Sequence, residues 1–154
     1  MRRWIPAALA LGLWAQKPQP IPFSHRTHVQ AGMKCAGCHA MPPPGDLATF
    51  PKEDQCMGCH TAIRPESPAI RKLAEFHRAG KRVPWNRIYQ LPDYTVFSHQ
   101  LHHRKAKIAC ETCHGPVGER EVLSQEKSIS MKTCMDCHDD RRASNECNVC
   151  HPPF

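Results

Sequence analysis

Ten cysteines constrain this chain of 154 residues more than any other feature, because they fall into five pairs with one common spacing. Two residues separate the cysteines of every pair, and a histidine follows the second cysteine at once. Positions i, i+3 and i+4 lie on one face of a helical turn, so two sulfurs and an imidazole can meet the same planar group. The pairs are Cys35/Cys38, Cys56/Cys59, Cys110/Cys113, Cys134/Cys137 and Cys147/Cys150, and the histidines are His39, His60, His114, His138 and His151.

The Cys-x-x-Cys-His pattern is the attachment signature of haem c. Its sulfurs form thioethers with the two vinyl groups of a porphyrin, and its histidine binds the iron as the proximal ligand. Paired cysteines are also found in disulfides of exported proteins, in four-cysteine zinc sites and in thioredoxin-like redox pairs. None of these requires a histidine after every pair, and five pairs do not divide into four-cysteine sites. The sequence therefore predicts five covalently bound haems.

The chain has few other residues with which to build a core. Aromatic residues make up only 6%, and 15 of the 154 residues are proline. We therefore expect one compact multihaem cytochrome c domain in which haems form the core, mostly irregular, with a few short α-helices and little or no sheet. The clearest helix is predicted over 68–78, with Ser67 as N-cap and a stop before Gly80, and a shorter one around 131–138; residues 40–55 are predicted to be a loop.

A duplication organises the chain. The element Phe-Ser-His-x-x-His at 23–28 recurs at 97–102, and each copy is followed by a Cys-x-x-Cys-His motif and then by a second one. The predicted organisation is a signal peptide at 1–15 and a single pentahaem domain at 16–154, built from two dihaem repeats (about 23–60 and 97–138), an insert at 61–96 and a fifth motif at 147–151.

Six histidines lie outside the motifs, one more than five irons need for a second axial ligand. The repeat matches His103 with Val29, so His103 is the predicted spare. His77 is predicted as the fifth ligand because it shares a helix stripe with Ile70 and Leu73. For each of these histidines the alternative is a solvated or packed side chain, and the methionines are interpreted as packing residues. The predicted distal ligands are His25, His28, His77, His99 and His102.

Residues 1–15 have the pattern of a secretory signal, in which Arg2 and Arg3 precede a short apolar stretch. That stretch is shorter than the roughly 20 residues that span a bilayer, although an uncleaved anchor is an alternative. We therefore expect a periplasmic or otherwise exported protein of a bacterium, without a membrane span.

The formal net charge of +7 does not indicate a nucleic-acid partner. Removal of the signal peptide lowers the charge to about +5, and the ten propionates of five haems bring it to about −5. The basic residues are therefore interpreted as partners of propionates. A basic run at 103–107 is either a solvated face or a docking site for an acidic redox partner.

The Phe-Ser-His-x-x-His element ahead of a Cys-x-x-Cys-His motif resembles the class III multihaem cytochromes c. The resemblance implies that His25 and His99 serve the haem of the motif that follows, and that His28 and His102 serve other haems. Residues 83–94, 97–99, 110–115 and 131–134 are similar to the pentahaem cytochrome subunit of alternative complex III and menaquinone reductase complexes.

This resemblance implies electron transfer by bis-histidine haems, with no catalytic residues. The electrons would be carried in the periplasm or relayed for a membrane quinol oxidoreductase or a terminal reductase complex, so the expected partners are redox proteins. The alternative is a multihaem reductase, which needs one haem with an open coordination site. No motif differs from the others in a way that indicates such a site.

Overall fold

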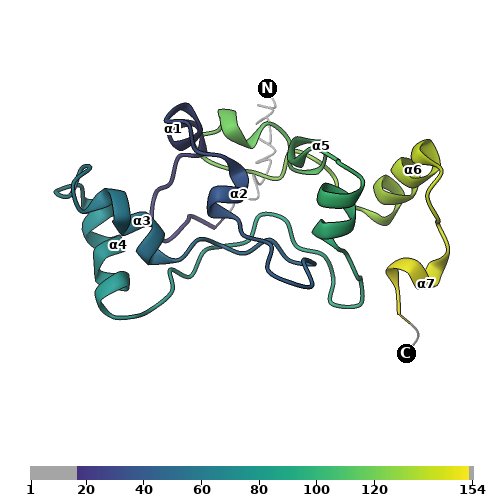
Figure 1. The fold of residues 1–154 in the computed structure, drawn as a ribbon, viewed down its shortest axis with the longest axis horizontal. Helices are drawn as coiled ribbons and strands as arrows, with labels where there is room; N and C mark the ends of the chain where they lie inside the picture. The colour runs from purple at the N-terminus through teal and green to yellow at the C-terminus, as the bar shows by residue number, and fades with distance from the viewer. Residues whose placement is uncertain (1–16, 153–154) are drawn as a thin grey trace, which may run out of the picture.

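The structure is a computed structural model that describes residues 17–152, so the predicted signal peptide at 1–15 lies outside the described residues. The described part of the chain contains short helices joined by long irregular segments and no β-strand, which confirms the predicted fold class (Figure 1). The elements are α1 (His25–Gln30), α2 (Cys35–Cys38), α3 (Glu53–His60), α4 (Pro68–Arg78), the π-helix η1 (Gln100–Lys105), α5 (Cys110–His114), the 3₁₀-helix η2 (Val117–Glu119), α6 (Met131–Arg141) and α7 (Cys147–Cys150).

Helix α4 has the bounds predicted from its sequence. Pro68 occupies its first position, where the missing N–H costs no hydrogen bond. Ser67 stands at the N-cap with extended backbone, but its side chain makes no capping bond. The helix ends at Arg78 and is followed by Gly80, whose φ of 63° favours glycine, and Lys81 N–H donates to the Phe76 carbonyl at 3.0 Å.

Two other predicted elements differ from the structure in their bounds. The loop predicted over 40–55 gives way to α3 at Glu53, because Lys52 caps that helix and the Gln55 side chain accepts a hydrogen bond from Lys52 N–H at 3.0 Å. The helix predicted around 131–138 continues as α6 to Arg141, and Arg142 ends it in the left-handed conformation with a φ of 55°.

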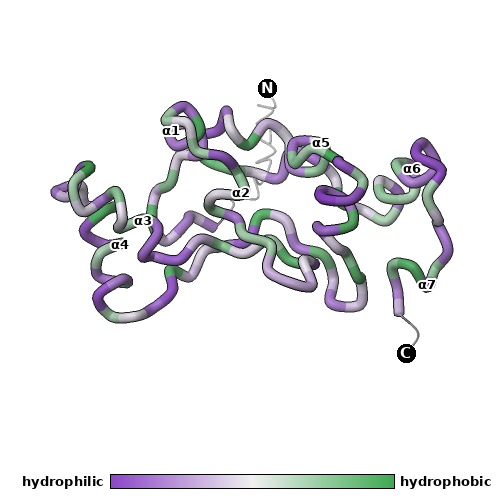
Figure 2. Tube along the Cα trace, viewed as in Figure 1, coloured by the Kyte–Doolittle hydropathy of each residue, from purple (hydrophilic) through white to green (hydrophobic). Residues whose placement is uncertain are grey.

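The polypeptide has only a small hydrophobic core. Leu73 of α4 packs with Ile21 and Val83, and these three side chains are the buried members of the cluster. Ile108 is the one other buried hydrophobic residue among residues 17–152, and no described side chain is less than 2% exposed. Apolar segments are spread along the whole trace rather than gathered at its centre (Figure 2). This arrangement leaves the interior to groups other than side chains, in agreement with a core made of haems.

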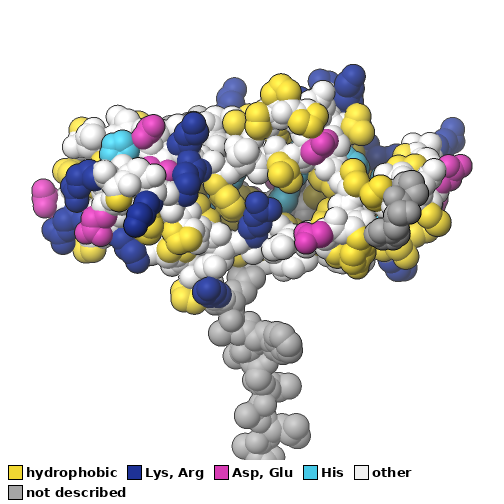
Figure 3. All heavy atoms as spheres, turned by 90° about the horizontal axis from the view of Figure 1, so that it is seen from below, with side chains coloured by type: hydrophobic (Ala, Val, Ile, Leu, Met, Phe, Trp, Pro, Cys, Tyr) yellow, Lys and Arg dark blue, Asp and Glu magenta, His cyan; other side chains and the backbone are white. Residues whose placement is uncertain are grey.

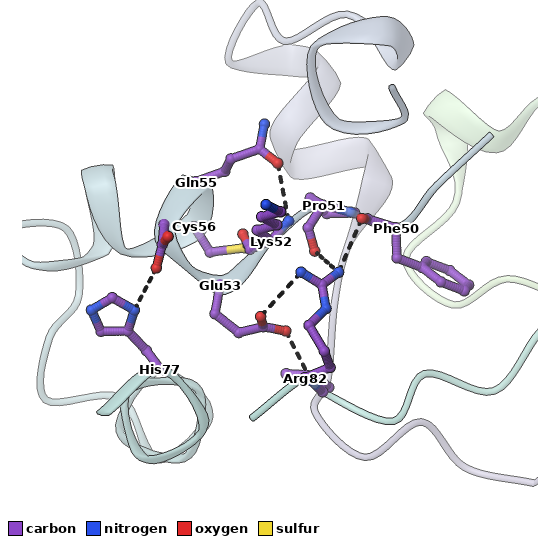
Figure 4. A network of polar contacts seen from close by, with 10 residues as sticks. Phe50, Pro51, Lys52, Glu53, Gln55, Cys56, His77 and Arg82 are labelled. Carbon is purple, nitrogen blue, oxygen red and sulfur yellow. Dashed lines mark hydrogen bonds and ion pairs between the residues drawn. The ribbon is translucent and has the colours of Figure 1, made fainter. Parts of the chain in front are cut away.

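A buried carboxylate fixes the start of α3. Glu53 is 7% exposed, accepts a hydrogen bond from Val83 N–H at 2.8 Å and pairs with Arg82 at 3.3 Å (Figure 4). Arg82 also donates to the carbonyl oxygens of Phe50 and Pro51 at 3.1 and 2.9 Å. A buried charge is tolerated when it is paired and hydrogen-bonded in this way. The network therefore holds α3, and the motif that it carries, against residues 81–83.

The chain is elongated, and its helices follow one another along the long axis in Figure 1. α3 and α4 lie at one end, α2 and α5 in the middle, and α6 and α7 at the other end. In the view turned by 90°, a histidine side chain is visible inside a hollow in the middle of one face (Figure 3). No helix within residues 17–152 is long and apolar enough to cross a bilayer. The division into two dihaem repeats stays a prediction.

Candidate haem-binding sites

Each of the five cysteine motifs lies on a helix. α2, α3, α5, α6 and α7 carry them in chain order. In the first and last motifs the histidine N–H donates to the carbonyl of the first cysteine, at 2.8 Å from His39 to Cys35 and at 2.9 Å from His151 to Cys147. The helical turn therefore directs both sulfurs and the imidazole of a motif to one side, as the spacing predicted.

The alternative uses of the cysteines have no counterpart in the described part of the chain. All ten cysteines lie within residues 17–152, and none forms a disulfide. The same residues contain no group of three or more histidine, cysteine, aspartate or glutamate side chains that could hold a metal ion by themselves.

The two cysteines of a motif differ in their exposure. Every motif has one half-buried and one exposed cysteine. The half-buried ones are Cys38, Cys56, Cys110, Cys137 and Cys150, and the exposed ones are Cys35, Cys59, Cys113, Cys134 and Cys147. The polypeptide alone therefore covers only one of the two predicted attachment points of each haem.

Cys59 is one of the five exposed cysteines of the motifs. It is an exposed residue in the last turn of α3, and its carbonyl accepts hydrogen bonds from Ala62 N–H at 3.1 Å and Ile63 N–H at 2.9 Å. A pocket beside α3 is lined by His60 and Met57, but among the described residues Cys59 does not line it. The assignment of Cys59 as a thioether residue therefore rests on the spacing of its motif and stays a prediction.

Four proximal histidines face a distal histidine predicted from the repeat. In each pair the ring centres lie 6.0 to 6.3 Å apart, which is too far for direct stacking contact. The pairs are His25/His39 (6.3 Å, 8° between ring planes), His28/His60 (6.1 Å, 63°), His99/His114 (6.3 Å, 3°) and His102/His138 (6.0 Å, 24°).

This spacing fits one iron between the two rings. A metal–imidazole bond is about 2.0 Å long and the ring centre lies roughly 1 Å behind the nitrogen, so two imidazoles on opposite sides of an iron have centres about 6 Å apart. The residues present therefore fit a six-coordinate haem at four of the five motifs. The pocket beside His60, lined also by Ile70 and Arg71, lies between α3 and α4 at the second motif.

Backbone carbonyls orient most of these imidazoles. The Nδ1–H of His28 donates to the Ser24 carbonyl at 2.7 Å, and that of His102 donates to the Ser98 carbonyl at 2.8 Å. Because a carbonyl oxygen only accepts, the proton resides on Nδ1 and the lone pair of Nε2 is free to bind a metal. The same kind of bond holds His39 to Thr49, His60 to Ile63, His99 to Asp46, His138 to Ser144 and His151 to Tyr94.

The repeated phenylalanine positions both histidines of its element. Phe23 stacks on His28, with centres 4.4 Å apart and planes at 20°, and meets His25 edge-on at 4.8 Å. Phe97 makes the same two contacts in the second repeat, at 4.3 Å and 4.9 Å. These phenylalanines were not predicted from the sequence to be part of the site. Their recurrence, together with the serine that supplies the carbonyl, was the signal for one.

Burial keeps two of the paired imidazoles neutral. Desolvation, and after it the nearby His39 and His28, lower the pKa of His25 to about 4. Desolvation, followed by His99 and His39, also lowers the pKa of His114. Neutral imidazole is the form that binds iron, so both residues are in the binding form at neutral pH.

The first three motifs are neighbours in space. Burial, and then the nearby Cys38, raise the pKa of the Cys56 thiol. The second motif therefore lies next to the first. Burial, and then the nearby Cys35, raise the pKa of the Cys110 thiol. The third motif therefore also lies next to the first.

The row continues through the last two motifs. Burial and then Cys137 raise the pKa of the Cys113 thiol, and burial and then Cys150 raise the pKa of the Cys134 thiol. The motifs therefore follow one another in the order second, first, third, fourth, fifth. Along the long axis in Figure 1, α3, α2 and α5 come in this order, and α6 and α7 lie together at the end beyond them.

Comparison with known proteins identifies the family. The family model described as cytochrome c7 and related cytochrome c matches residues 95–152. A protein of Nitratidesulfovibrio vulgaris named "Menaquinone reductase, multiheme cytochrome c subunit" is 32% identical, over 94% of this chain and 85% of its own length. The chain belongs to the multihaem cytochromes c. This cytochrome is also 28% identical to the multiheme cytochrome MtrA of Shewanella baltica, over 79% of this chain and 32% of the relative.

Two histidines of this cytochrome stand outside the four pairs. His77 is an exposed residue of α4, and its Nδ1 lies 3.0 Å from a carboxylate oxygen of Asp54 (Figure 4). His103 is a half-buried residue of η1 that donates from Nδ1 to the Ile108 carbonyl at 2.9 Å. The structure thus does not bring His77, the predicted fifth distal ligand, to the remaining proximal histidine, because α4 and α7 lie at opposite ends (Figure 1).

The ring angles predict two kinds of electron paramagnetic resonance signal. Two parallel imidazoles act on the same iron d orbital and split the d levels widely, whereas crossed imidazoles act on different orbitals and split them less. We expect a rhombic low-spin signal from His25/His39, with 8° between planes, and a signal with a large maximal g value from His28/His60, with 63°. Replacing His28 by alanine should abolish the second signal and keep the first, with His25→Ala as the converse control. A large-g signal that survives in the His28 variant contradicts this assignment.

Proposed function

We propose that this cytochrome carries five haems c, each with two histidine ligands, and relays electrons along their row between the α3 end and the α7 end. The observation that carries the proposal is the set of four imidazole pairs, each spaced for one iron. The close approach of cysteines from successive motifs supports the row. Electron carriage itself is the activity of the family.

The residues of the chain prepare these sites for electron transfer in three ways. The cysteines attach each porphyrin at a fixed place, and the motif histidine fixes one side of it. The Nδ1–carbonyl bonds hold most of the imidazoles in the tautomer and orientation that leave Nε2 available. Haem c, when bound, supplies an iron that alternates between the ferrous and ferric states. Because both axial positions would be filled by held imidazoles, neither ligand has to move when the charge changes.

We place this relay outside the cytoplasm and next to a quinone-linked membrane complex. The predicted signal peptide and the covalent attachment of haem support an exported location, and the name of the Nitratidesulfovibrio vulgaris relative supports a place beside a menaquinone reductase. The redox partners are then a membrane oxidoreductase and a second electron carrier. Nucleic acid has no part in this proposal.

The number of haems tests the proposal. When the protein is produced with the complete cytochrome c maturation machinery, we expect its intact mass under denaturing conditions to exceed that of the mature chain by five haems, because thioethers survive denaturation. Replacing Cys147 and Cys150 by alanine is the matched control and should lower the count by one. A wild-type mass with four haems or fewer contradicts the proposal.

A further inference from the structure

We infer that His103, and not His77, is the second axial ligand of the fifth haem. The inference rests on the proposed function, because it assigns a residue to a haem that the fifth motif would hold. It replaces the ligand that the sequence alone predicted. Four observations support it: the positions of α4 and η1 relative to α7, the surroundings of His77 and His103, the hydrogen-bond pattern of η1, and the haem motif that the neighbouring His102 faces.

The position of α7 favours η1 as the source of the ligand. His151 is the proximal histidine without a partner among the four pairs. Its Nδ1–H donates to the Tyr94 carbonyl at 3.0 Å, and Val96 N–H donates to the Cys150 carbonyl at 2.8 Å. The segment bonded to α7 therefore leads directly, through residues 97–99, into η1. α4, which carries His77, lies at the opposite end of the molecule (Figure 1).

The surroundings of the two side chains point the same way. All eleven histidines lie within the described residues, and ten of them are half-buried. His77 is the exposed one, with 39% of its side chain accessible. The Nδ1 of His77 is next to the exposed carboxylate of Asp54. The Nδ1–H of His103 instead donates to a carbonyl, that of the buried Ile108, as His28 and His102 do in their pairs. His103 thus has the fixed orientation and the free Nε2 of the paired histidines.

The π-helix η1 gives His103 a place that the first repeat lacks. In α1, Ala31 N–H donates to the Thr27 carbonyl at 3.1 Å, four residues earlier. The matching bond in η1 runs from Ala106 N–H to the Leu101 carbonyl at 2.9 Å, five residues earlier. The second repeat therefore has one extra residue between matching backbone groups. π-turns of this kind are rare in proteins, and those that occur are often found at functional sites.

The extra residue changes which haem the helix reaches. His102 keeps the role of its counterpart in the first repeat, since it faces His138 of the fourth motif at 6.0 Å. The next residue on a helix points in a different direction from its neighbour. Because the fifth motif follows the fourth in the row, His102 and His103 would bind successive irons and tie the last two haems to one turn of backbone.

The test compares His103→Ala with His77→Ala in the fully matured protein, by carbon monoxide binding and by intact mass. We expect the His103 variant to keep five haems, of which one, or about a fifth of the total, becomes high-spin and binds carbon monoxide. The His77 variant should keep five low-spin haems and bind no more carbon monoxide than the wild type. A His103→Gly variant should regain the low-spin spectrum when imidazole is added, which separates a lost ligand from damaged folding.

Three results overturn the inference. The first is a His103→Ala protein in which all five haems stay low-spin, and the second is a His77→Ala protein in which one haem opens. The third is the near-infrared band of a methionine–iron bond in the oxidised wild type. None of these results contradicts the proposed electron relay, as long as the wild-type protein carries five haems. A wild-type protein with fewer than five haems by mass contradicts the proposed function itself, whichever histidine is the ligand.

Discussion

Without covalently attached haem, this cytochrome is expected to remain unfolded. The three buried members of the hydrophobic cluster, Ile21, Leu73 and Val83, join only α4 and two loop segments. α1, α2, α5, α6 and α7 bury no side chain of their own. Isolated helices of this length are marginal in water, and these five have no buried side chain to hold them in place.

The apoprotein can be made by expressing residues 16–154 in a cytoplasm without the maturation machinery. We expect a circular dichroism spectrum with little helix, narrow amide dispersion in the nuclear magnetic resonance spectrum and no cooperative thermal transition. The matured protein, measured in the same buffer, is the control. A cooperative transition of the haem-free chain, with dispersed amide signals, contradicts a core made of haems.

Replacing His102 by alanine is expected to open one haem in five. His102 is held by the Ser98 carbonyl at 2.8 Å and by the ring of Phe97, and it faces His138 across the spacing of one iron. Its removal leaves an iron with one protein ligand, so about a fifth of the haem should become high-spin and bind carbon monoxide. The wild type should bind almost none.

The same measurement separates an electron carrier from a multihaem reductase. A reductase needs an open iron in the unmodified protein, so substantial carbon monoxide binding by the wild type would favour that alternative. Gln100→Ala, in the same turn of η1, is the matched control and should behave as the wild type. A His102→Ala protein that stays entirely low-spin contradicts the pairing of His102 with His138.

The sequence contained most of the candidate sites because the chemistry of haem attachment leaves a local pattern. The five motifs were evident from spacing, and the repeat predicted four distal histidines, each of which faces a proximal histidine in the structure. Helix α4 was predicted with its observed bounds because proline and glycine act on the backbone of their own neighbourhood. Spacing did not predict the exposure of single cysteines such as Cys59, because exposure depends on what packs against the motif and not on the motif itself.

Two features that bear on the fifth distal ligand were not evident from the sequence. Matching the repeats residue by residue set His103 against Val29, because one extra residue in a π-turn leaves no mark in composition or periodicity. His77 was predicted as a ligand because it shares a stripe of α4 with Ile70 and Leu73, whereas Leu73 packs on Ile21 of the polypeptide and His77 is exposed beside Asp54. The order of the motifs in space also required the structure, since it differs from their order along the chain.

The central claim is a single row of five haems, each between two histidines, in the order second, first, third, fourth, fifth motif. A crystal structure of the matured protein, with anomalous differences measured at the iron absorption edge, tests it most directly. The account predicts five iron peaks in that order along the molecule, with His39 and His60 each on one side of an iron and His25 and His28 on the other. Fewer than five peaks, a branched arrangement, or an iron bound by only one of its two predicted histidines would contradict it.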